Sequence, residues 1–210
     1  MPADSAIQPT EHSSMQRLVF ASHNPHKMEE IRAILGPDFL LSGLDELGCD
    51  TEIPEPYDSL VDNAMAKARF VARHYGCDCF ADDTGLEVDV LGGLPGVQSA
   101  RFAGPQKDSR ANVNKLLTML SDHDRPRARF RTIIALILEG REYFFEGRVE
   151  GVIIGEPRGD GGFGYDPVFV PDGQDQTFAE MDSHKKNRIS HRKQALAKLA
   201  AFLRSRSTAR

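Results

Sequence analysis

Two adjacent carboxylates, Asp82 and Asp83, follow directly on the apolar residues of a short strand expected over residues 77–81. A buried carboxylate without a partner costs a large amount of free energy, so this pair needs a neutralising group in a buried strand, and a metal ion would serve. Thr84 and Gly85 are expected to turn the chain next, which predicts a shaped loop in place of a core strand. The segment is therefore a candidate site. In the alternative interpretation, the two acids cap a turn or a helix on the solvated surface.

A polar hexapeptide joins a strand expected over residues 17–21 to a helix expected over residues 28–35. It comprises Ser22, His23, Asn24, Pro25, His26 and Lys27. At such a helix N-terminus the free backbone N–H groups and the helix dipole favour an anion, and Lys27 adds a cation. The segment lacks the GxxxxGK[ST] pattern of a phosphate loop. It is a candidate phosphate site, with an ordinary capped loop as the alternative.

Four glycines surround Phe163 and Tyr165 in the segment RGDGGFGYDP, residues 158–167. Glycine at this density lets the backbone approach a partner closely or adopt positive φ angles. An aromatic ring beside glycine-rich backbone suits stacking on a planar base. In the alternative, this is a plain hairpin whose two aromatic side chains fill the core.

Basic residues gather over residues 183–193, SHKKNRISHRK, ahead of an expected C-terminal helix. Ser190 is expected to be the N-cap of that helix, which places His191 and Arg192 in its first turn. Cations there oppose the helix dipole, a local cost that is often tolerated where an anion or a base is bound. The alternative for the other lysines and arginines is a solvated charged face.

The expected elements that position these segments indicate an α/β fold. Strands are expected over residues 17–21, 39–41, 77–81, 127–138, 142–149 and 168–170, and helices over residues 28–35, 59–75, 108–120 and from 190 onward. The long apolar run at 127–138 is typical of a central strand, and Glu139-Gly140 can turn it into an antiparallel partner, so a mixed sheet is predicted. One domain is expected over residues 15–205, between a polar tail at 1–14 and a short tail at 206–210.

The composition restricts the function classes. The chain carries 26 basic and 31 acidic residues, a formal net charge of −5, so no global positive field favours nucleic acid. This argues against the main alternative function, an RNA-binding module that uses the basic stretch 185–193. Cys49, Cys77 and Cys79 form no disulfide framework or zinc motif and suit a reducing compartment. No apolar run approaches the roughly 20 residues of a membrane span, and residues 1–14 lack a secretory signal. A cytoplasmic protein with no membrane or nucleic-acid partner is expected.

Four motifs in order, SHNPHK, FADDTGLEVDVLGGLPGVQSARFAG, GGFGYDP and KNRISHR, resemble those of the inosine triphosphate pyrophosphatase (Ham1-like) family. The resemblance runs from about residue 18 to residue 202. It implies phosphate binding by Ser22, Asn24 and Lys27, substrate contact by Thr84, a base pocket at Phe163, Gly164, Tyr165 and Asp166, and further substrate contacts by Lys186, His191 and Arg192. It also implies that Asp83 is the general base and a magnesium ligand, with Glu55 as a second ligand. At His23 and His26 the family often has glycine.

The same resemblance implies an elongated α/β fold, a mixed sheet flanked by helices and two lobes with a central cleft, usually in a homodimer. The implied activity is Mg²⁺-dependent hydrolysis of the purine nucleotides ITP, dITP and XTP to the monophosphate and diphosphate, which cleanses the nucleotide pool. We expect His191, Arg192 and nearby N–H groups to donate to the purine 6-keto oxygen, where adenine presents a donor and would leave them unpaired. A hydrolase of modified pyrimidine nucleotides with a related fold is the remaining alternative.

Overall fold

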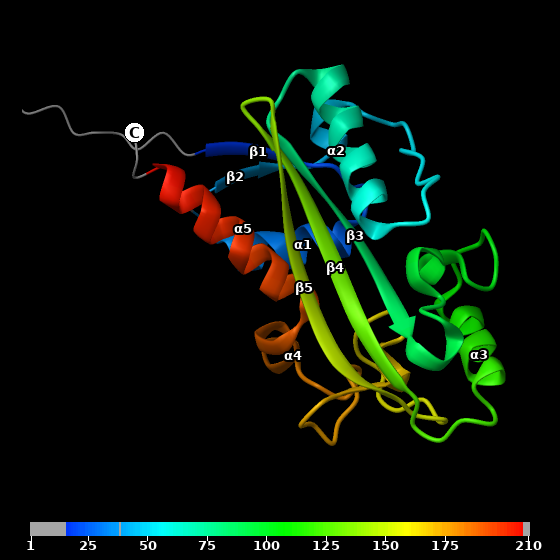
Figure 1. Ribbon diagram of the computed structural model, residues 1–210. Coiled ribbons are helices and arrows are strands. Elements are labelled where there is room, and N and C mark those ends of the chain that lie inside the picture. Colours follow the sequence, from blue (N-terminus) through cyan, green and yellow to red (C-terminus); the bar gives the residue numbers. More distant parts are fainter. Residues whose placement is uncertain (1–15, 38, 208–210) are drawn as a thin grey trace, which may run out of the picture.

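The computed structural model describes residues 16–37 and 39–207, which form one six-stranded sheet with helices on both faces (Figure 1). The strands are β1 (Gln16–Phe20), β2 (Phe39–Ser42), β3 (Cys79–Val88), β4 (Arg127–Leu138), β5 (Arg141–Ile153) and β6 (Phe169–Pro171). The helices are α1 (Pro25–Leu35), α2 (Leu60–Tyr75), α3 (Ser109–Met119), α4 (Ser183–Ile189) and α5 (His191–Ser207), with short 3₁₀ helices η1 (Asp45–Leu47), η2 (Asp89–Leu91), η3 (Gly96–Arg101) and η4 (Asp166–Val168).

The sheet is mixed, as the sequence predicts. Its strand order is β2-β1-β3-β4-β5-β6. The pairs of β1 with β2 and with β3 are parallel, whereas β3, β4, β5 and β6 pair antiparallel in succession. The parallel part includes the β1-α1-β2 unit, in which the hexapeptide forms the turn after β1 and the first residues of α1, since this helix begins at Pro25 and not at the expected residue 28.

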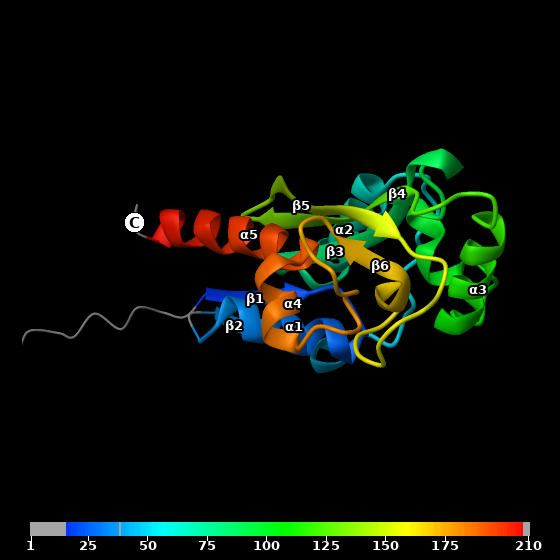
Figure 2. The same ribbon diagram turned by 90° about the horizontal axis from the view of Figure 1, so that it is seen from below.

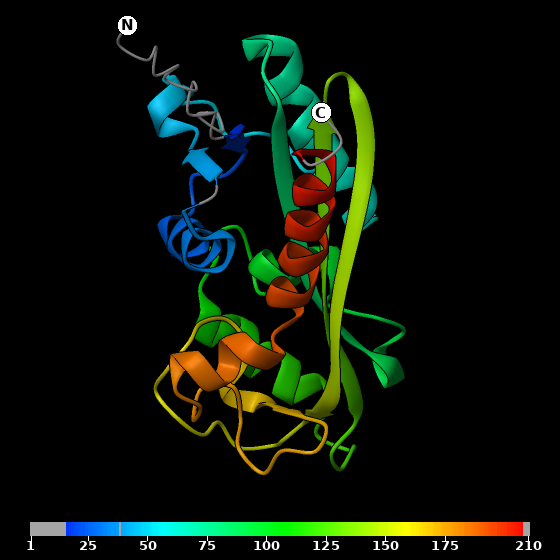
Figure 3. The same cartoon turned by 90° about the vertical axis from the view of Figure 1, so that its left-hand side faces the viewer.

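The apolar run of β4 reflects burial on both faces of the sheet. Side chains alternate across a strand, so Ile133, Ala135 and Ile137 pack in the cluster that includes α2. The intervening Ile134 and Leu136 pack against α1 and α5. Figure 3 shows α5 lying along β4 and β5. A strand covered on both sides has no polar face, which explains its continuous hydrophobic pattern.

The predicted turn at Thr84-Gly85 is wrong, because β3 continues through it to Val88 in antiparallel register with β4. Gly85 has a packing role here. A Cβ atom at that position would lie 2.5 Å from the carbonyl oxygen of Gly96, so its absence allows η3 to approach the strand. The carboxylates Asp82 and Asp83 therefore lie inside a regular strand, and groups from other elements must neutralise them.

The two ends of the sheet carry different cores, and α3 lies at the end remote from the C-terminal part of α5 (Figure 2). Around α3 and β6, a separate cluster is built on residues that include Val113, Phe130 and Phe169. At the start of α5, a Cβ atom on Gly147 of β5 would clash with the carbonyl oxygen of His191. The glycine thus lets the first turn of α5 lie directly on the sheet.

Smaller differences concern the ends of elements. Helix α4 was not expected, and α5 extends to Ser207, two residues past the predicted domain end at 205. The predicted tail at 1–14 lies outside the described residues. Within the described part of the chain, no helix has the length and apolar character needed to cross a membrane.

Candidate functional site

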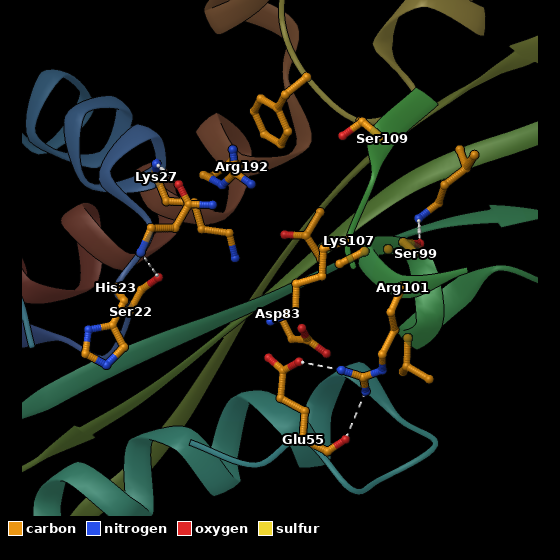
Figure 4. Close-up of a pocket in the computed structure, with 18 of the residues that line it drawn as sticks. Ser22, His23, Lys27, Glu55, Asp83, Ser99, Arg101, Lys107, Ser109 and Arg192 are labelled. Atoms are coloured by element: carbon orange, nitrogen blue, oxygen red, sulfur yellow. Dashed lines mark hydrogen bonds and ion pairs between the residues drawn. The ribbon is translucent and has the colours of Figure 1, made fainter. Parts of the chain in front are cut away.

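A cleft of about 720 Å³ lies beside β3, at the level where its pairing with β1 has ended (Figure 4). Pairing between β1 and β3 is confined to residues 19–20 and 79–80. Beyond that point the edge of β3 faces the cleft, so neighbouring residues on opposite faces of the strand, Asp83 and Thr84, both line it. The walls come from the start of α1, from α2, η3, α4 and the beginning of α5.

Most of the residues that the sequence indicates for the site line this one cleft. They are Ser22, His23, Asn24, Lys27, Glu55, Asp83, Thr84, Phe163, Gly164, Tyr165, Asp166, Lys186, His191 and Arg192. Pro25, which begins α1, does not line it. The side chain of His26 lies outside the described part of the structure.

The hexapeptide forms the N-terminus of α1, as predicted. The side chain of Asn24 caps the helix by accepting from Lys27 N, and Asn24 N donates to Ser22 Oγ over 3.2 Å. His23 turns away from this end, because its Nδ1 lies 2.9 Å from Oδ1 of Asp45. That contact is the largest cause of the raised pKa of His23. The imidazole thus connects the turn to the start of η1.

Asp83 faces a lysine from α2 that the sequence reading missed. Lys67 Nζ lies 3.4 Å from Asp83 Oδ1 and also donates to Glu55 Oε1. Burial raises the pKa of Asp83 above its ordinary value, although Lys67 opposes this. Burial lowers the pKa of Lys67. The negative charges of Asp83 and Glu55 together have a larger effect, so the pKa of this lysine is raised above its ordinary value. The result is a buried cation between two acids.

Asp83 also has an oxygen available for a further ligand. Its Oδ2 is buried and has no hydrogen-bond partner among the described residues. Glu55, which shares Lys67 with it, lies on the same wall of the cleft. Within the described residues, no group of three or more His, Cys, Asp or Glu side chains could hold a metal ion. A two-carboxylate site fits Mg²⁺, which takes its other ligands from phosphate oxygens and water.

Asp82 points to the opposite face and does not act as a pair with Asp83. Its Oδ1 accepts from Lys27 Nζ over 2.8 Å, and its Oδ2 lies 3.5 Å from Nε of Arg192. Burial tends to raise the Asp82 pKa, but these two cations lower it far below its ordinary value. The carboxylate is therefore neutralised by α1 and α5 and needs no metal ion.

The glycine-rich segment uses its two aromatic residues differently. Tyr165 is buried and donates from its hydroxyl to the carbonyl oxygen of Ser99 over 2.9 Å. Phe163 is 48% exposed, and Lys186 Nζ lies 5.0 Å from the centre of its ring. Asp166 holds this arrangement, because its Oδ2 accepts from Phe163 N and from Lys186 Nζ, each over 2.7 Å. The core-filling alternative is correct for the tyrosine, while the phenylalanine ring is about half exposed beside the cations of Lys186 and Arg192.

His191 and Arg192 occupy the first turn of α5, and Ser190 Oγ accepts from Lys193 N as the predicted cap. The imidazole of His191 stacks on Phe130, with ring centres 4.8 Å apart and an interplanar angle of 9°. Its Nδ1 is buried without a hydrogen-bond partner among the described residues. Burial lowers the pKa of His191 well below its ordinary value, and the charge of Arg192 adds to this. The ring is therefore neutral at pH 7.

This shifted pKa predicts that His191 weakens the fold in acid. The unfolded chain binds a proton on this histidine below about pH 6.5 while the folded protein does not, so stability falls as the pH falls. The charges of Lys186 and Lys27 also lower the pKa of His191, whereas the charge of Asp82 raises it. Urea unfolding should show wild type losing up to about 1.4 kcal/mol per pH unit relative to His191→Gln between about pH 6 and 5. Parallel stability curves for the two proteins would contradict the buried neutral imidazole.

Lys67 and Arg101 are the main site residues that the sequence reading missed. Lys67 follows Leu60 and Ala64 at helical spacing on the apolar stripe of α2, so a charged residue at this position was a usable signal. Arg101 on η3 donates from Nη2 to the carbonyl oxygen of Glu55 over 3.1 Å, and Lys107 and Ser109 also line the cleft (Figure 4). No local pattern marks these last three.

Comparisons with known proteins identify the family of this chain. A model of the Ham1 family matches residues 18–202. The chain is 55% identical over 190 residues to a dITP/XTP pyrophosphatase of Porphyromonas gingivalis, covering 90% of this chain and 98% of that one. It is 45% identical over 193 residues to a dITP/XTP pyrophosphatase of Bacillus subtilis, with the same coverage.

Solved structures give the same result for the fold. The Ham1 protein of Staphylococcus aureus superimposes with a TM-score of 0.84 at 37% identity, covering 91% of this chain and all of that one. A HAM1 protein from Coxiella burnetii gives a TM-score of 0.85 at 36% identity with the same coverage. The resemblance carried by the four sequence motifs is thus confirmed, and this chain belongs to the Ham1 family.

Proposed function

We propose that this protein hydrolyses the non-canonical purine nucleoside triphosphates ITP, dITP and XTP to the monophosphate and diphosphate, with Mg²⁺. One observation carries the proposal. A single cleft brings together the N-terminus of a helix, a buried carboxylate oxygen that has no partner among the described residues, and an exposed aromatic ring beside buried polar groups. The named relatives, which are dITP/XTP pyrophosphatases, support the same substrate class.

The triphosphate binds at the start of α1 in this proposal. Backbone N–H groups of the helix N-terminus and the ammonium of Lys27 offset its negative charge. Ser22 and Asn24 lie at the same end and hold the turn in shape. The part of the cleft assigned to the triphosphate, here called the phosphate end, is therefore one turn at the start of α1, and the hydrogen bonds of Ser22 and Asn24 already hold that turn in place.

Glu55 and Asp83 are the residues that would hold Mg²⁺. When bound, the ion neutralises charge on the triphosphate and helps to orient it. The orphaned Oδ2 of Asp83 supports this assignment, as does the approach of both carboxylates to one cation, Lys67.

Asp83 is also the group placed to accept a proton from the attacking water. A carboxylate whose pKa is raised by burial is a stronger base than one in water, which favours this role. Lys67 fixes the carboxylate through its Oδ1, while Thr84 approaches the cleft from the opposite face of β3. The protein thus supplies the proton acceptor and its orientation.

Base choice is assigned to the opposite end of the cleft. Phe163 offers its ring for stacking, Lys186 and Arg192 lie near that ring, and His191 lines the same cleft. A neutral His191 with hydrogen on Nδ1 can donate to a 6-keto oxygen, whereas the amino group of adenine would leave this buried donor unpaired. The proposal therefore expects discrimination against ATP.

A nucleotide panel tests the function. With Mg²⁺, the protein should convert ITP, dITP and XTP to monophosphate and diphosphate at least about 10²-fold faster, in kcat/KM, than ATP or GTP. Chelation by EDTA should abolish turnover, and added Mg²⁺ should restore it. Equal rates on all nucleotides, or release of single phosphate, would reject the proposal. Faster turnover of modified pyrimidine nucleotides would favour the alternative hydrolase.

The proposal includes a cytoplasmic homodimer. The family resemblance supports the dimer, and the free thiols of Cys49, Cys77 and Cys79 suit a reducing compartment. Light scattering coupled to gel filtration measures the mass in solution, and a monomer at micromolar concentration would contradict the dimer.

A further inference from the structure

Asp82 is a buried carboxylate that touches three cleft-lining groups without lining the cleft itself. Its side chain is 2% exposed. Besides the contacts with Lys27 and Arg192, its Oδ2 accepts from Thr84 Oγ1 over 3.5 Å, and Thr84 Oγ1 is also 2.7 Å from Thr132 Oγ1. The three groups come from α1, α5 and β3, so one carboxylate connects elements that are far apart in the sequence.

The charges around Asp82 depend on one another. Burial has the largest effect on the pKa of Lys27 and lowers it, the charges of Lys67 and Arg192 lower it further, and Asp82 opposes all three. Without the carboxylate between them, two buried cations would repel each other in a region of low dielectric. Asp82 therefore determines where both cations can lie.

These two cations lie toward different parts of the substrate. Lys27 belongs to the first turn of α1, where the triphosphate binds. The guanidinium of Arg192 lies 5.7 Å from the ring centre of Phe163, on the side where the base stacks. Asp82 thus contacts one residue at the proposed phosphate end of the cleft and one at its proposed base end.

We propose that Asp82 is a positioning residue that holds the side chains of Lys27 and Arg192 in place. One buried carboxylate would thus orient the lysine toward the phosphates and the arginine toward the base. The inference rests on the proposed function, since it takes the two cations as substrate contacts. It separates the roles of the adjacent acids: Asp83 lines the cleft and acts on the substrate directly, whereas Asp82 acts through the cleft-lining residues that it contacts.

Equilibrium binding of two partial ligands tests the proposal without requiring turnover. Diphosphate with Mg²⁺ reports on the phosphate end, by calorimetry, and inosine reports on the base end, by NMR titration. In Asp82→Asn, both Kd values should rise about tenfold or more, because hydrogen bonds to charged groups contribute at this level. Lys27→Met should raise the Kd of diphosphate and leave that of inosine within about twofold.

A double variant identifies the route of the effect. If Asp82 acts through Lys27, diphosphate should bind Asp82→Asn/Lys27→Met as weakly as Lys27→Met alone, within about twofold. A full additional tenfold loss would overturn the positioning role, and so would wild-type Kd values for both ligands in Asp82→Asn.

Glu87→Gln is the matched control. Glu87 lies on the same strand, its side chain is 17% exposed, and it pairs with Arg129 and Arg131, yet it does not line the cleft. Both Kd values should be unchanged in this variant, and a rise equal to that in Asp82→Asn would overturn the proposal. Failure of wild type to bind either ligand would instead reject the proposed function, and with it this inference.

A second variant covers the case in which Asp82→Asn does not fold, since removing one partner of a buried ion pair is strongly destabilising. Asp82→Glu keeps the charge and displaces the carboxylate by one methylene. Both Kd values should then rise about threefold, with less effect on unfolding, and unchanged values would overturn the proposal.

Discussion

Asp83→Asn should lower kcat for ITP hydrolysis by about 10³-fold or more, while the protein stays folded. The substitution removes the proton acceptor and one of the two carboxylates that would hold Mg²⁺. Asparagine has nearly the same shape, so the strand β3 and its register with β4 should persist. Steady-state kinetics with a saturating ITP concentration measure the loss in kcat.

The Asp83→Asn substitution should not lower the stability of the fold, although it lowers activity. Burial raises the pKa of Asp83, which means that the folded state disfavours its charge. The neutral amide should therefore leave the unfolding temperature unchanged or raise it. Asp89→Asn is the control, because Asp89 is exposed, pairs with Arg129 and lies outside the cleft. Wild-type turnover in Asp83→Asn, or an equal loss in Asp89→Asn, would refute the assigned role.

Lys67→Met should reduce kcat/KM by about 10²-fold or more. The methionine fills a similar volume but removes the cation that lies between Glu55 and Asp83. The two carboxylates then repel each other and lose their common hydrogen-bond donor, so their orientation changes. Kinetics at several Mg²⁺ concentrations measure this, and extra Mg²⁺ should restore only part of the rate.

Lys115→Met provides the comparison for Lys67. The ammonium of Lys115 donates to the carbonyl oxygen of Phe102 over 2.6 Å, and the residue does not line the cleft. Its replacement should leave kcat/KM within about twofold of wild type. If Lys67→Met were equally active, the buried lysine would be a structural partner only.

Much of the fold could be predicted because its elements have strong local patterns. The apolar run of β4, the stripe of α2 and the cap Ser190 all lie where the sequence indicates. The course of β3 could not be predicted in this way. Its two carboxylates look incompatible with a buried strand until cations from α1, α2 and α5 are placed beside them, and those contacts depend on tertiary structure.

The candidate site likewise contains residues that the sequence could mark and residues whose role depends on tertiary contacts. Motifs marked Lys27, Asp83 and Phe163 because their residue types are unusual for their positions. Arg101 reaches the cleft from η3 through its approach to Glu55, which no spacing in the sequence indicates. The difference between Phe163 and Tyr165 was equally hidden, since it depends on whether the fold places a buried acceptor within reach of the tyrosine hydroxyl.

The central claim is that phosphate and base of one nucleotide occupy this one cleft together. A crystal structure of Asp83→Asn with dITP and Mg²⁺ tests it most directly, because the slow variant should retain its substrate. We predict the triphosphate at the start of α1 beside Lys27 and the base against the ring of Phe163. A nucleotide bound elsewhere on the molecule, with the cleft empty, would contradict the account.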